Sequence, residues 1–551
     1  MPKTTKKTPS TIKARRSPAG NVKGIKATAL KAMLADGREI AIIDPREEGV
    51  FGRSHLLLAV NIPLSRLEIR IGSLVPRKTT RIVLTDDGDG MAGRAASVLG
   101  KRGYRSLGIL QGGLAAWKAA GYEVFSGMSV PTKAFGEWIS VTYGTPSICA
   151  EELHAKLASG ADVVILDSRP ANEYVNMTIP GSINVPTSEL VYRFGELPVG
   201  PDTFVVVNCA GRTRSLIGTQ TLINAGVPNP VAALRGGTML WQMAGFDLEH
   251  GASRHAPEPW GKNLTRAIET ARGVAERFGA QTIDGKTLER FKAQSGKRTL
   301  YIFDVRTPDE YRAGHRPDSS YAWGVQLVQS TDKFAATRNA RIVLVDNFMA
   351  RAFMTASWLV QAGWPETYVL ADPLAGVTLE TGESHAVVPG LNRIKLPRVK
   401  PAEAQKLIRK KAGVIDFADS LSYKNGHIPG AWHAIRSRLA QCLGKIPASD
   451  GYVVTGDDAA LTALSARDLA KLTGKPVVIL EGGNEAWRAA GLPLAQGFEN
   501  LSTTPDDVFR MPFLWGHFEE KVEFEVAALA YIDWELQLPA QIERAAELKF
   551  K

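Results

Sequence analysis

The chain repeats one pattern four times, and this repeat restricts its fold more than any other feature of its 551 residues. In each copy an apolar run ends in an aspartate, and a second apolar run ends in a cysteine or another aspartate. The two landmarks are 42 residues apart in three copies and 41 apart in the fourth, and a glycine always follows 17 residues later. Such matched spacings indicate repeated structural units. The landmark pairs are Asp44 and Asp86, Asp167 and Cys209, Asp304 and Asp346, and Asp416 and Asp457.

Each copy alternates short β-branched runs with amphipathic stretches, which predicts an α/β fold with a mostly parallel sheet and helices on both faces. A unit of about 110 residues can bury a core of its own, so we expect four tandem domains and not a solenoid. The expected domains are residues 22–128, 132–250, 283–388 and 389–496. Residues 251–282 form a linker with a helix from Asn263 to Phe278, whose apolar residues recur at helical spacing.

Two terminal segments belong to no copy. Residues 1–21 form a basic tail rich in Thr, Ser and Pro, which we expect to be disordered. Eight lysines and arginines and no acid lie within residues 1–26, out of a net charge of +11, but no aromatic residues interleave them to stack on bases. Nucleic-acid binding is therefore not expected. Residues 497–551 form a helical extension, with aromatic residues Phe513, Trp515 and Phe518 and then a helix over Val522–Gln537 that Pro539 ends.

Composition excludes several classes of protein. No apolar run approaches the roughly 18 residues that span a bilayer, and no apolar segment follows the N-terminal charges, so we expect a cytoplasmic protein without a membrane partner. Three cysteines cannot form a disulfide framework, and the nine histidines show no HExxH spacing. We expect no metal and no cofactor. The oligomeric state cannot be read from the sequence.

Only the second copy carries a thiol at the end of its second apolar run. The run Val205-Val206-Val207-Asn208 leads to Cys209, and a Gly/Arg loop and a helical stretch follow. A Gly-Gly pair whose second glycine lies four residues before a tryptophan occurs in the first, second and fourth copies, whereas the third has Asp372-Pro373 there. The motifs of the second copy are Asp167-x-Arg169-x-x-x-Glu173-Tyr174, Ile179-Pro180-Gly181-Ser182-Ile183-Asn184-Val185-Pro186, Cys209-Ala210-Gly211-Arg212-Thr213-Arg214-Ser215 and Gly236-Gly237-x-x-x-Trp241.

These motifs, in this order, resemble the rhodanese (sulfurtransferase) family from about residue 22 to residue 495. The fourth copy carries the entry motif most fully, as Gly426-His427-Ile428-Pro429-Gly430-Ala431. The resemblance implies an active cysteine at a strand end, at the bottom of a loop that wraps it. It also implies transfer of sulfane sulfur from a small anionic donor, thiosulfate or a persulfide, through a cysteine persulfide. The acceptor would be cyanide or a thiol, including a protein thiol.

The residues after Cys209 suit this chemistry. Sulfur transfer needs a thiolate, because the neutral thiol is a poor nucleophile. A helix beginning near Ser215 would direct its positive end at the sulfur, and the loop could turn its N–H groups inward. Gly211 would permit the required backbone dihedrals, and Arg212 and Arg214 would attract an anionic donor. The expected catalytic residue is Cys209, and the expected substrate-binding residues are Ala210, Gly211, Arg212, Thr213, Arg214 and Ser215.

The other copies serve as internal controls. A carboxylate cannot carry a persulfide sulfur, but it can accept the N–H groups of the loop. We therefore expect Asp86, Asp346 and Asp457 to be built-in anions that close three inactive loops. The Asp-x-Arg pair persists in copies without cysteine, as Asp44/Arg46 and Asp304/Arg306, which favours a structural, loop-fixing role. Core positions are expected for Trp117, Trp241 and Trp487, and inert thiols for Cys149 and Cys442.

Two other functions remain open at this point. A cysteine phosphatase or arsenate reductase would use a Cys-x5-Arg loop, whereas Cys209 and Arg214 are one residue closer together. A non-enzymatic scaffold that senses sulfur or oxidants, or binds a partner, is also compatible with three inactive copies.

Overall fold

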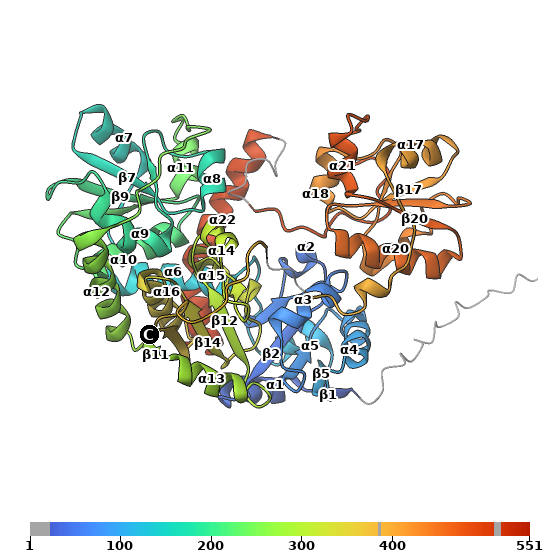
Figure 1. The fold of residues 1–551 in the computed structure, drawn as a ribbon, viewed down its shortest axis with the longest axis horizontal. Helices are drawn as coiled ribbons and strands as arrows, with labels where there is room; N and C mark the ends of the chain where they lie inside the picture. The colour runs from blue at the N-terminus through green and yellow to red at the C-terminus, as the bar shows by residue number, and fades with distance from the viewer. Residues whose placement is uncertain (1–21, 384–386, 512–519) are drawn as a thin grey trace, which may run out of the picture.

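The computed structural model describes residues 22–383, 387–511 and 520–551. It contains four five-stranded sheets, one per sequence copy, and every strand pairing within them is parallel (Figure 1). Numbered along the chain, the strands of each sheet lie in the order first, fifth, fourth, second, third. The α/β class and the four tandem domains are therefore confirmed. The basic tail and the aromatic residues Phe513, Trp515 and Phe518 lie outside the described residues.

The first two domains follow this plan with helices on both faces of each sheet. The first domain contains β1 (Lys23–Ile25), α1 (Ala27–Ala35), β2 (Ile40–Asp44), α2 (Glu48–Phe51), β3 (Ala59–Asn61), α3 (Leu67–Leu74), β4 (Arg81–Leu84), α4 (Met91–Lys101), β5 (Leu107–Leu110) and α5 (Gly113–Ala119). The second contains α6 (Val130–Tyr143), β6 (Ser147–Ile148), α7 (Ala150–Ala158), β7 (Val163–Asp167), α8 (Ala171–Asn176), β8 (Ile183–Asn184), α9 (Leu190–Arg193), β9 (Phe204–Asn208), α10 (Thr213–Asn224), β10 (Val231–Leu234) and α11 (Gly237–Met243).

The third and fourth domains repeat this plan, except that the third has no helix after its last strand within its described residues. The third domain contains β11 (Gln281–Ile283), α13 (Gly285–Ala293), β12 (Leu300–Asp304), α14 (Pro308–Ala313), β13 (Ser320–Tyr321), α15 (Gly324–Gln329), β14 (Arg341–Val345), α16 (Ala350–Gln361) and β15 (Thr367–Leu370). The fourth contains β16 (Arg398–Val399), α17 (Pro401–Arg409), β17 (Gly413–Asp416), α18 (Ser420–Asn425), β18 (Trp432–His433), α19 (Leu439–Cys442), β19 (Tyr452–Thr455), α20 (Ala459–Thr473), β20 (Val477–Leu480) and α21 (Gly483–Ala489). The third domain has no counterpart of α5, α11 and α21 within its described residues, and it is the copy without the Gly-Gly-Trp element.

The central strands are apolar along their whole length because helices cover both faces of each sheet. In β9, Val205, Val206 and Val207 are all fully buried, and they pair in parallel with β7 and β10. The register sets Asp167 of β7 opposite Asn208 of β9. The carboxyl ends of the two strands therefore meet at one edge of the sheet, and the residue after Asn208 is Cys209.

The third domain contacts both the second and the first, and the first also contacts the fourth. The second and third domains meet through side chains such as Trp323, whose Nε1 donates to Glu189 at 3.2 Å, and Trp358, whose Nε1 donates to Thr221 at 3.0 Å. The linker helix α12 (Gly261–Arg277) joins these two domains and buries its apolar face in the core of the third. Ion pairs connect the first and fourth domains, including Arg436 with Glu68 at 2.7 Å.

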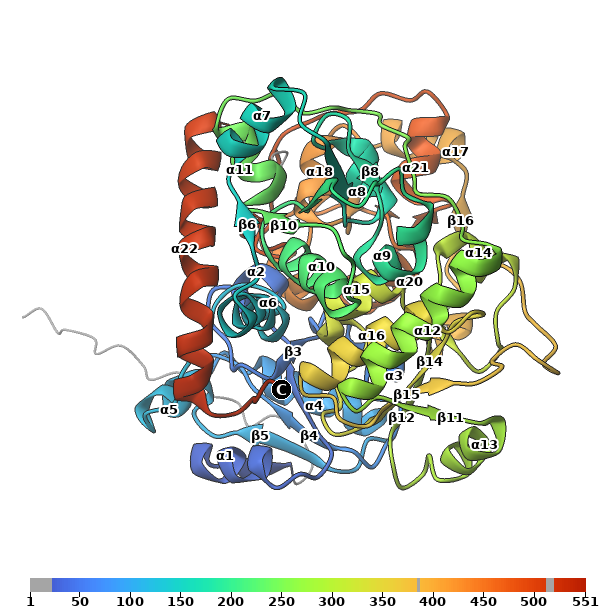
Figure 2. The ribbon, with the colours of Figure 1, turned by 90° about the vertical axis from the view of Figure 1, so that its left-hand side faces the viewer.

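A last helix, α22 (Lys521–Ala545), runs along one side of the molecule from the second domain to the first (Figure 2). Pro539 lies inside this helix, so the prediction that proline ends it is wrong. Proline removes one backbone hydrogen bond and crowds the preceding turn. The helix nevertheless continues past Pro539, because Leu538 before it and Ile542 and Ala545 after it are buried in the core of the first domain. Among the described residues, no helix is long and apolar enough to cross a membrane.

Candidate active site

Cys209 lies between β9, the middle strand of the second sheet, and α10. Its side chain is 1% exposed, and its Sγ lies 3.6 Å from Oγ of Ser215. The Ser215 hydroxyl in turn donates to the carbonyl of Arg212 at 2.8 Å. Since α10 begins at Thr213, the N–H groups of its first turn lack helical partners and lie beside the loop. The helix end thus places positive partial charge near the sulfur.

The Gly-Gly element holds the cysteine's backbone from the side. Thr238 N–H donates to the carbonyl of Cys209 at 2.9 Å, and Met239 N–H donates to that of Ala210 at 3.1 Å. Gly237 has a φ of 54°, and a Cβ there would lie 2.0 Å from the Cys209 carbonyl oxygen. Only glycine fits this position. Trp241, four residues on, is a core residue with 3% exposure.

Both arginines of the loop are held in two-point ion pairs. Arg212 donates through Nε and an Nη to Glu137 of α6, each at 2.7 Å, and Arg214 donates through both Nη atoms to Glu173 of α8 at 2.7 and 2.8 Å. Burial alone would lower the pKa of Arg214, but the charge of Glu173 and its hydrogen bonds outweigh burial and raise it. The two arginines therefore remain charged, but an anionic sulfur donor would have to share each of them with its carboxylate partner.

Gly211 departs from the expectation for its backbone. It is not among the residues with positive φ, so its place in the loop does not depend on a left-handed conformation. A Cβ at Gly211 would lie 3.8 Å from the ring of Tyr531, which is ordinary contact distance. The space beside Gly211 is thus bounded by a side chain of the C-terminal helix.

The C-terminal helix covers the loop, and the sequence does not predict this contact. Thr213 Oγ1 donates to Glu535 at 3.2 Å, and the Tyr531 hydroxyl donates to the same carboxylate oxygen at 2.8 Å. Phe524, Ala528 and Tyr531 also pack against Met239, which follows the Gly-Gly element. Tyr531 and Glu535 therefore form the roof of the site, although they lie more than 300 positions away from Cys209 in the chain.

A buried lysine completes the charged surroundings. Lys133 of α6 is 4% exposed, and burial lowers its pKa. Its charge acts on Glu535, Arg214, Cys209 and Glu173. Sequence reasoning missed this lysine and both glutamates that contact the loop from outside the second repeat's core motifs. A signal was available for Glu535, because this carboxylate interrupts the buried apolar face of its helix.

The Asp-x-Arg pair fixes a neighbouring loop, the role that its persistence in other copies favours. Arg169 donates through Nε and Nη2 to Asp167 and through Nη2 to the carbonyl of Met177. Arg46 makes the same contacts with Asp44 and Ser54, and Arg306 with Asp304 and Gly314.

Two of the expected built-in anions accept loop N–H groups. Asp86 accepts from Gly88 and Ala92, each at 2.9 Å. Asp346 accepts from the N–H groups of Arg351 at 2.9 Å and Ala352 at 3.3 Å. In both loops the carboxylate therefore accepts from the first turn of the helix that follows, and Asp86 accepts from the loop as well.

The assignment of Asp457 to the cysteine position is wrong. Strand register sets Asp416 opposite Thr455, as Asp167 is opposite Asn208, so the residue equivalent to Cys209 is Gly456. The Gly-Gly element agrees, because Asn484 N–H points to the Gly456 carbonyl. Gly456 lies 18 residues before Gly474, whereas this spacing is 17 in the other copies, so the fixed spacing of 17 gave Asp457, which is exposed. Asp458 caps α20 instead, accepting from Ala460 and Leu461 at 2.9 and 3.0 Å.

The other two cysteines lie outside such loops. Cys149 caps α7, where its Sγ accepts from the Glu152 N–H at 3.4 Å. Cys442 is fully buried at the end of α19.

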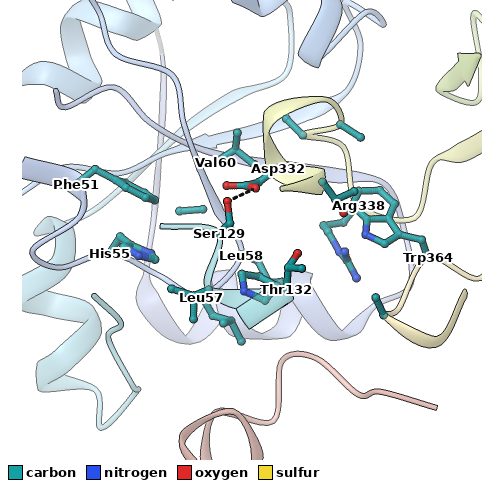
Figure 3. A pocket seen from close by; sticks show the side chains of 17 residues that line it. Phe51, His55, Leu57, Leu58, Val60, Ser129, Thr132, Asp332, Arg338 and Trp364 are labelled. Atoms are coloured by element: carbon teal, nitrogen blue, oxygen red, sulfur yellow. Dashed lines mark hydrogen bonds between the residues drawn. The ribbon is translucent and has the colours of Figure 1, made fainter. Parts of the chain in front are cut away.

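A cavity of about 40 Å³ lies between the first and third domains (Figure 3). Arg338 stacks on Trp364 at one side, 4.4 Å from the ring centre, Phe51 and His55 lie at the opposite side, and Ser129 donates to Asp332 at 2.9 Å between them. None of its lining residues belongs to the Cys209 loop. This cavity is therefore separate from the candidate active site.

Known proteins resemble this chain over most of its length and over each of its repeats. The rhodanese-like domain family matches residues 26–120, 150–244, 287–377 and 400–490. A crystal structure of a thiosulfate sulfurtransferase from Pseudomonas aeruginosa superposes with a TM-score of 0.90 and 42% identity, covering 96% of this chain and 99% of that one.

Curated relatives match shorter regions. A thiosulfate sulfurtransferase of P. aeruginosa is 29% identical over 171 residues, which are 27% of this chain and 62% of the relative. An HTH-type transcriptional regulator of Mycobacterium tuberculosis is 32% identical over 111 residues, which are 20% of this chain and 48% of the regulator. The chain thus spans about half to two thirds of these relatives. With four matched domains in the arrangement seen in its sheets, the chain belongs to the rhodanese family.

Proposed function

We propose that the protein is a sulfurtransferase whose single working site is Cys209. The observation that carries this proposal is that one of four equivalent loops has a thiol, and that this thiol lies at a strand end beside the N-terminus of α10. The resemblance to thiosulfate sulfurtransferases supports the same chemistry.

In the first half-reaction the Cys209 thiolate attacks the outer sulfur of a donor such as thiosulfate. A bond forms between Sγ and that sulfur, the donor's S–S bond breaks, and sulfite leaves with the electron pair. One difficult transfer is thereby divided into two easier ones. Arg212 and Arg214 remain the expected anion-binding residues, acting from their ion pairs with Glu137 and Glu173.

In the second half-reaction an acceptor, cyanide or a thiol, attacks the outer sulfur of the persulfide. The bond between Sγ and that sulfur breaks, and Cys209 is restored as a thiolate. Because Cys209 is 1% exposed beneath α22, small acceptors are favoured over a protein thiol.

The test is to incubate the full-length protein with thiosulfate, measure its intact mass, then add cyanide and follow thiocyanate. We expect a gain of one sulfur atom that cyanide discharges, and loss of both signals in Cys209→Ser. Cys442→Ser is the matched control and should retain them, because Cys442 lies in the fourth domain. An unloaded wild type that hydrolyses an aryl phosphate would instead support a phosphatase, and loading without turnover would support a sulfur sensor.

A further inference from the structure

The two half-reactions differ in their proton balance. Loading from thiosulfate moves no proton, since a thiolate attacks and sulfite leaves as an anion. Discharge to a thiol releases one proton, because RSH enters and RSS⁻ and the Cys209 thiolate result. A general base beside the loop would therefore accelerate only the second step with a protonated acceptor.

Three carboxylates surround the Cys209 loop, and they differ in their partners. Glu137 is paired with Arg212 and Glu173 with Arg214, each through two hydrogen bonds. Within the described residues, Glu535 forms no ion pair; its Oε1 accepts from the hydroxyls of Thr213 and Tyr531. Its Oε2 is buried and has no hydrogen-bond partner in the part of the chain that the structure describes.

We propose that Glu535 of α22 takes the proton of a thiol acceptor during discharge of the Cys209 persulfide. This inference rests on the proposed function. The acceptor sulfur bonds to the outer persulfide sulfur, the bond from that sulfur to Cys209 Sγ breaks with its electron pair remaining on Sγ, and the acceptor's proton passes to the Glu535 carboxylate. Thr213 joins the base to the loop, and the Tyr531 hydroxyl orients its carboxylate.

The environment of Glu535 suits a group that exchanges a proton. Its side chain is fully buried, and burial raises its pKa, as does the charge of Glu137 from α6. Lys133 of α6, Arg212 of the loop and the Tyr531 hydroxyl oppose this rise. By contrast, Arg214 lowers the pKa of Glu173 despite its burial, so that carboxylate is the poorer base.

The test uses single-turnover discharge of the loaded full-length protein and the variant Glu535→Gln, which keeps an oxygen to accept from Thr213 and Tyr531. With a thiol of high pKa as acceptor, we expect discharge to slow by about 10²-fold. With sulfite as acceptor, which reverses loading and needs no proton transfer, we expect an unchanged rate. Glu543→Gln is the matched control, because it removes the same charge from an exposed position of α22.

Each outcome decides the proposal. Selective slowing with the thiol supports it. Equal slowing with thiol and sulfite, no slowing at all, or failure of Glu535→Gln to load sulfur would overturn it, because Glu535 would then be structural or irrelevant. A wild-type protein that never loads sulfur would refute the proposed function itself, which separates the two failures.

Discussion

The loop after β9 and the loop after β14 have the same frame, but the first position holds Cys209 in one and Asp346 in the other. In each, the fifth residue after the strand-end position is an arginine paired with a glutamate of the preceding short helix: Arg214 with Glu173, and Arg351 with Glu310. In the second domain the residue that follows the strand is Cys209, and in the described ranges Arg214 forms its ion pair with Glu173 alone. In the third it is Asp346, which binds Arg351 at 2.8 Å as well as the loop N–H groups. The aspartate thus occupies the position and the contacts that an anionic ligand would need.

The first prediction tests whether that difference alone separates the two loops. In a Cys209→Ser background, Asp346→Cys should leave sulfur transfer at least roughly 10³-fold below the wild-type rate, because the third loop lacks the roof that Tyr531 and Glu535 provide over the second. Thiocyanate formation measures this. Full activity of the double variant would show that the third loop is complete and that only its cysteine is missing.

The second prediction concerns stability. Asp346 and Arg351 are both fully buried, so Asp346→Asn should destabilise the third domain by about 3 kcal/mol, since it leaves part of a buried guanidinium charge uncompensated. Hydrogen exchange of the α16 amides in the full-length protein reports the loss. Asp309→Asn is the control: its side chain is 95% exposed in its ion pair, and little change is expected. Equal effects of both changes would mean that Asp346 does not hold the loop.

The third prediction concerns the stability of the fourth domain and has the smallest expected effect. Here Asp416 is not followed two residues later by an arginine, as Asp44, Asp167 and Asp304 are. Burial raises the pKa of Asp416 to about 7. The folded state therefore binds a proton that the unfolded state has lost, so the stability of this domain should fall as pH rises from about 4 to about 7. Between pH 5 and pH 7 we expect a loss of about 2 kcal/mol.

Hydrogen exchange of the β17 amides at these two pH values measures the loss, and Asp416→Asn should abolish the dependence. Stability that rises with pH over this interval, or that remains sloped in the variant, would contradict the assignment.

Local patterns were enough to predict the frame of each domain. Strands such as Val205–Val207 are apolar because helices cover both faces of the sheet. Glycine is required at positions such as Gly237, where two backbone segments approach closely. Both requirements can be recognised in the sequence. The position of Cys209 follows from them. Counting residues failed only in the fourth domain, where the stretch from the end of β19 to Gly474 is one residue longer than its counterpart in the second domain. A count of 17 back from Gly474 therefore gives Asp457, and only the strand register identifies Gly456.

The surroundings of the thiol could not be predicted in the same way. Glu535 and Tyr531 reach the loop through tertiary packing of a distant helix, and no spacing rule relates them to Cys209. The length of that helix was also underestimated, since burial of Leu538 and Ile542 in another domain outweighs the local effect of Pro539. The carboxylate partners of Arg212 and Arg214 likewise become visible only once α6 and α8 are placed.

The C-terminal position of α22 has a consequence for the order in which the protein is made. The second domain is complete at about residue 250, but Glu535 leaves the ribosome 285 residues later. At roughly 5–20 residues per second, that interval is about 15–60 s. During this time Cys209 stands in a folded domain without its roof, open to oxidants and to passing thiols. The thiol is enclosed only after α22 has been made, so a chain that stops before this helix would leave exposed a cysteine that the helix otherwise covers.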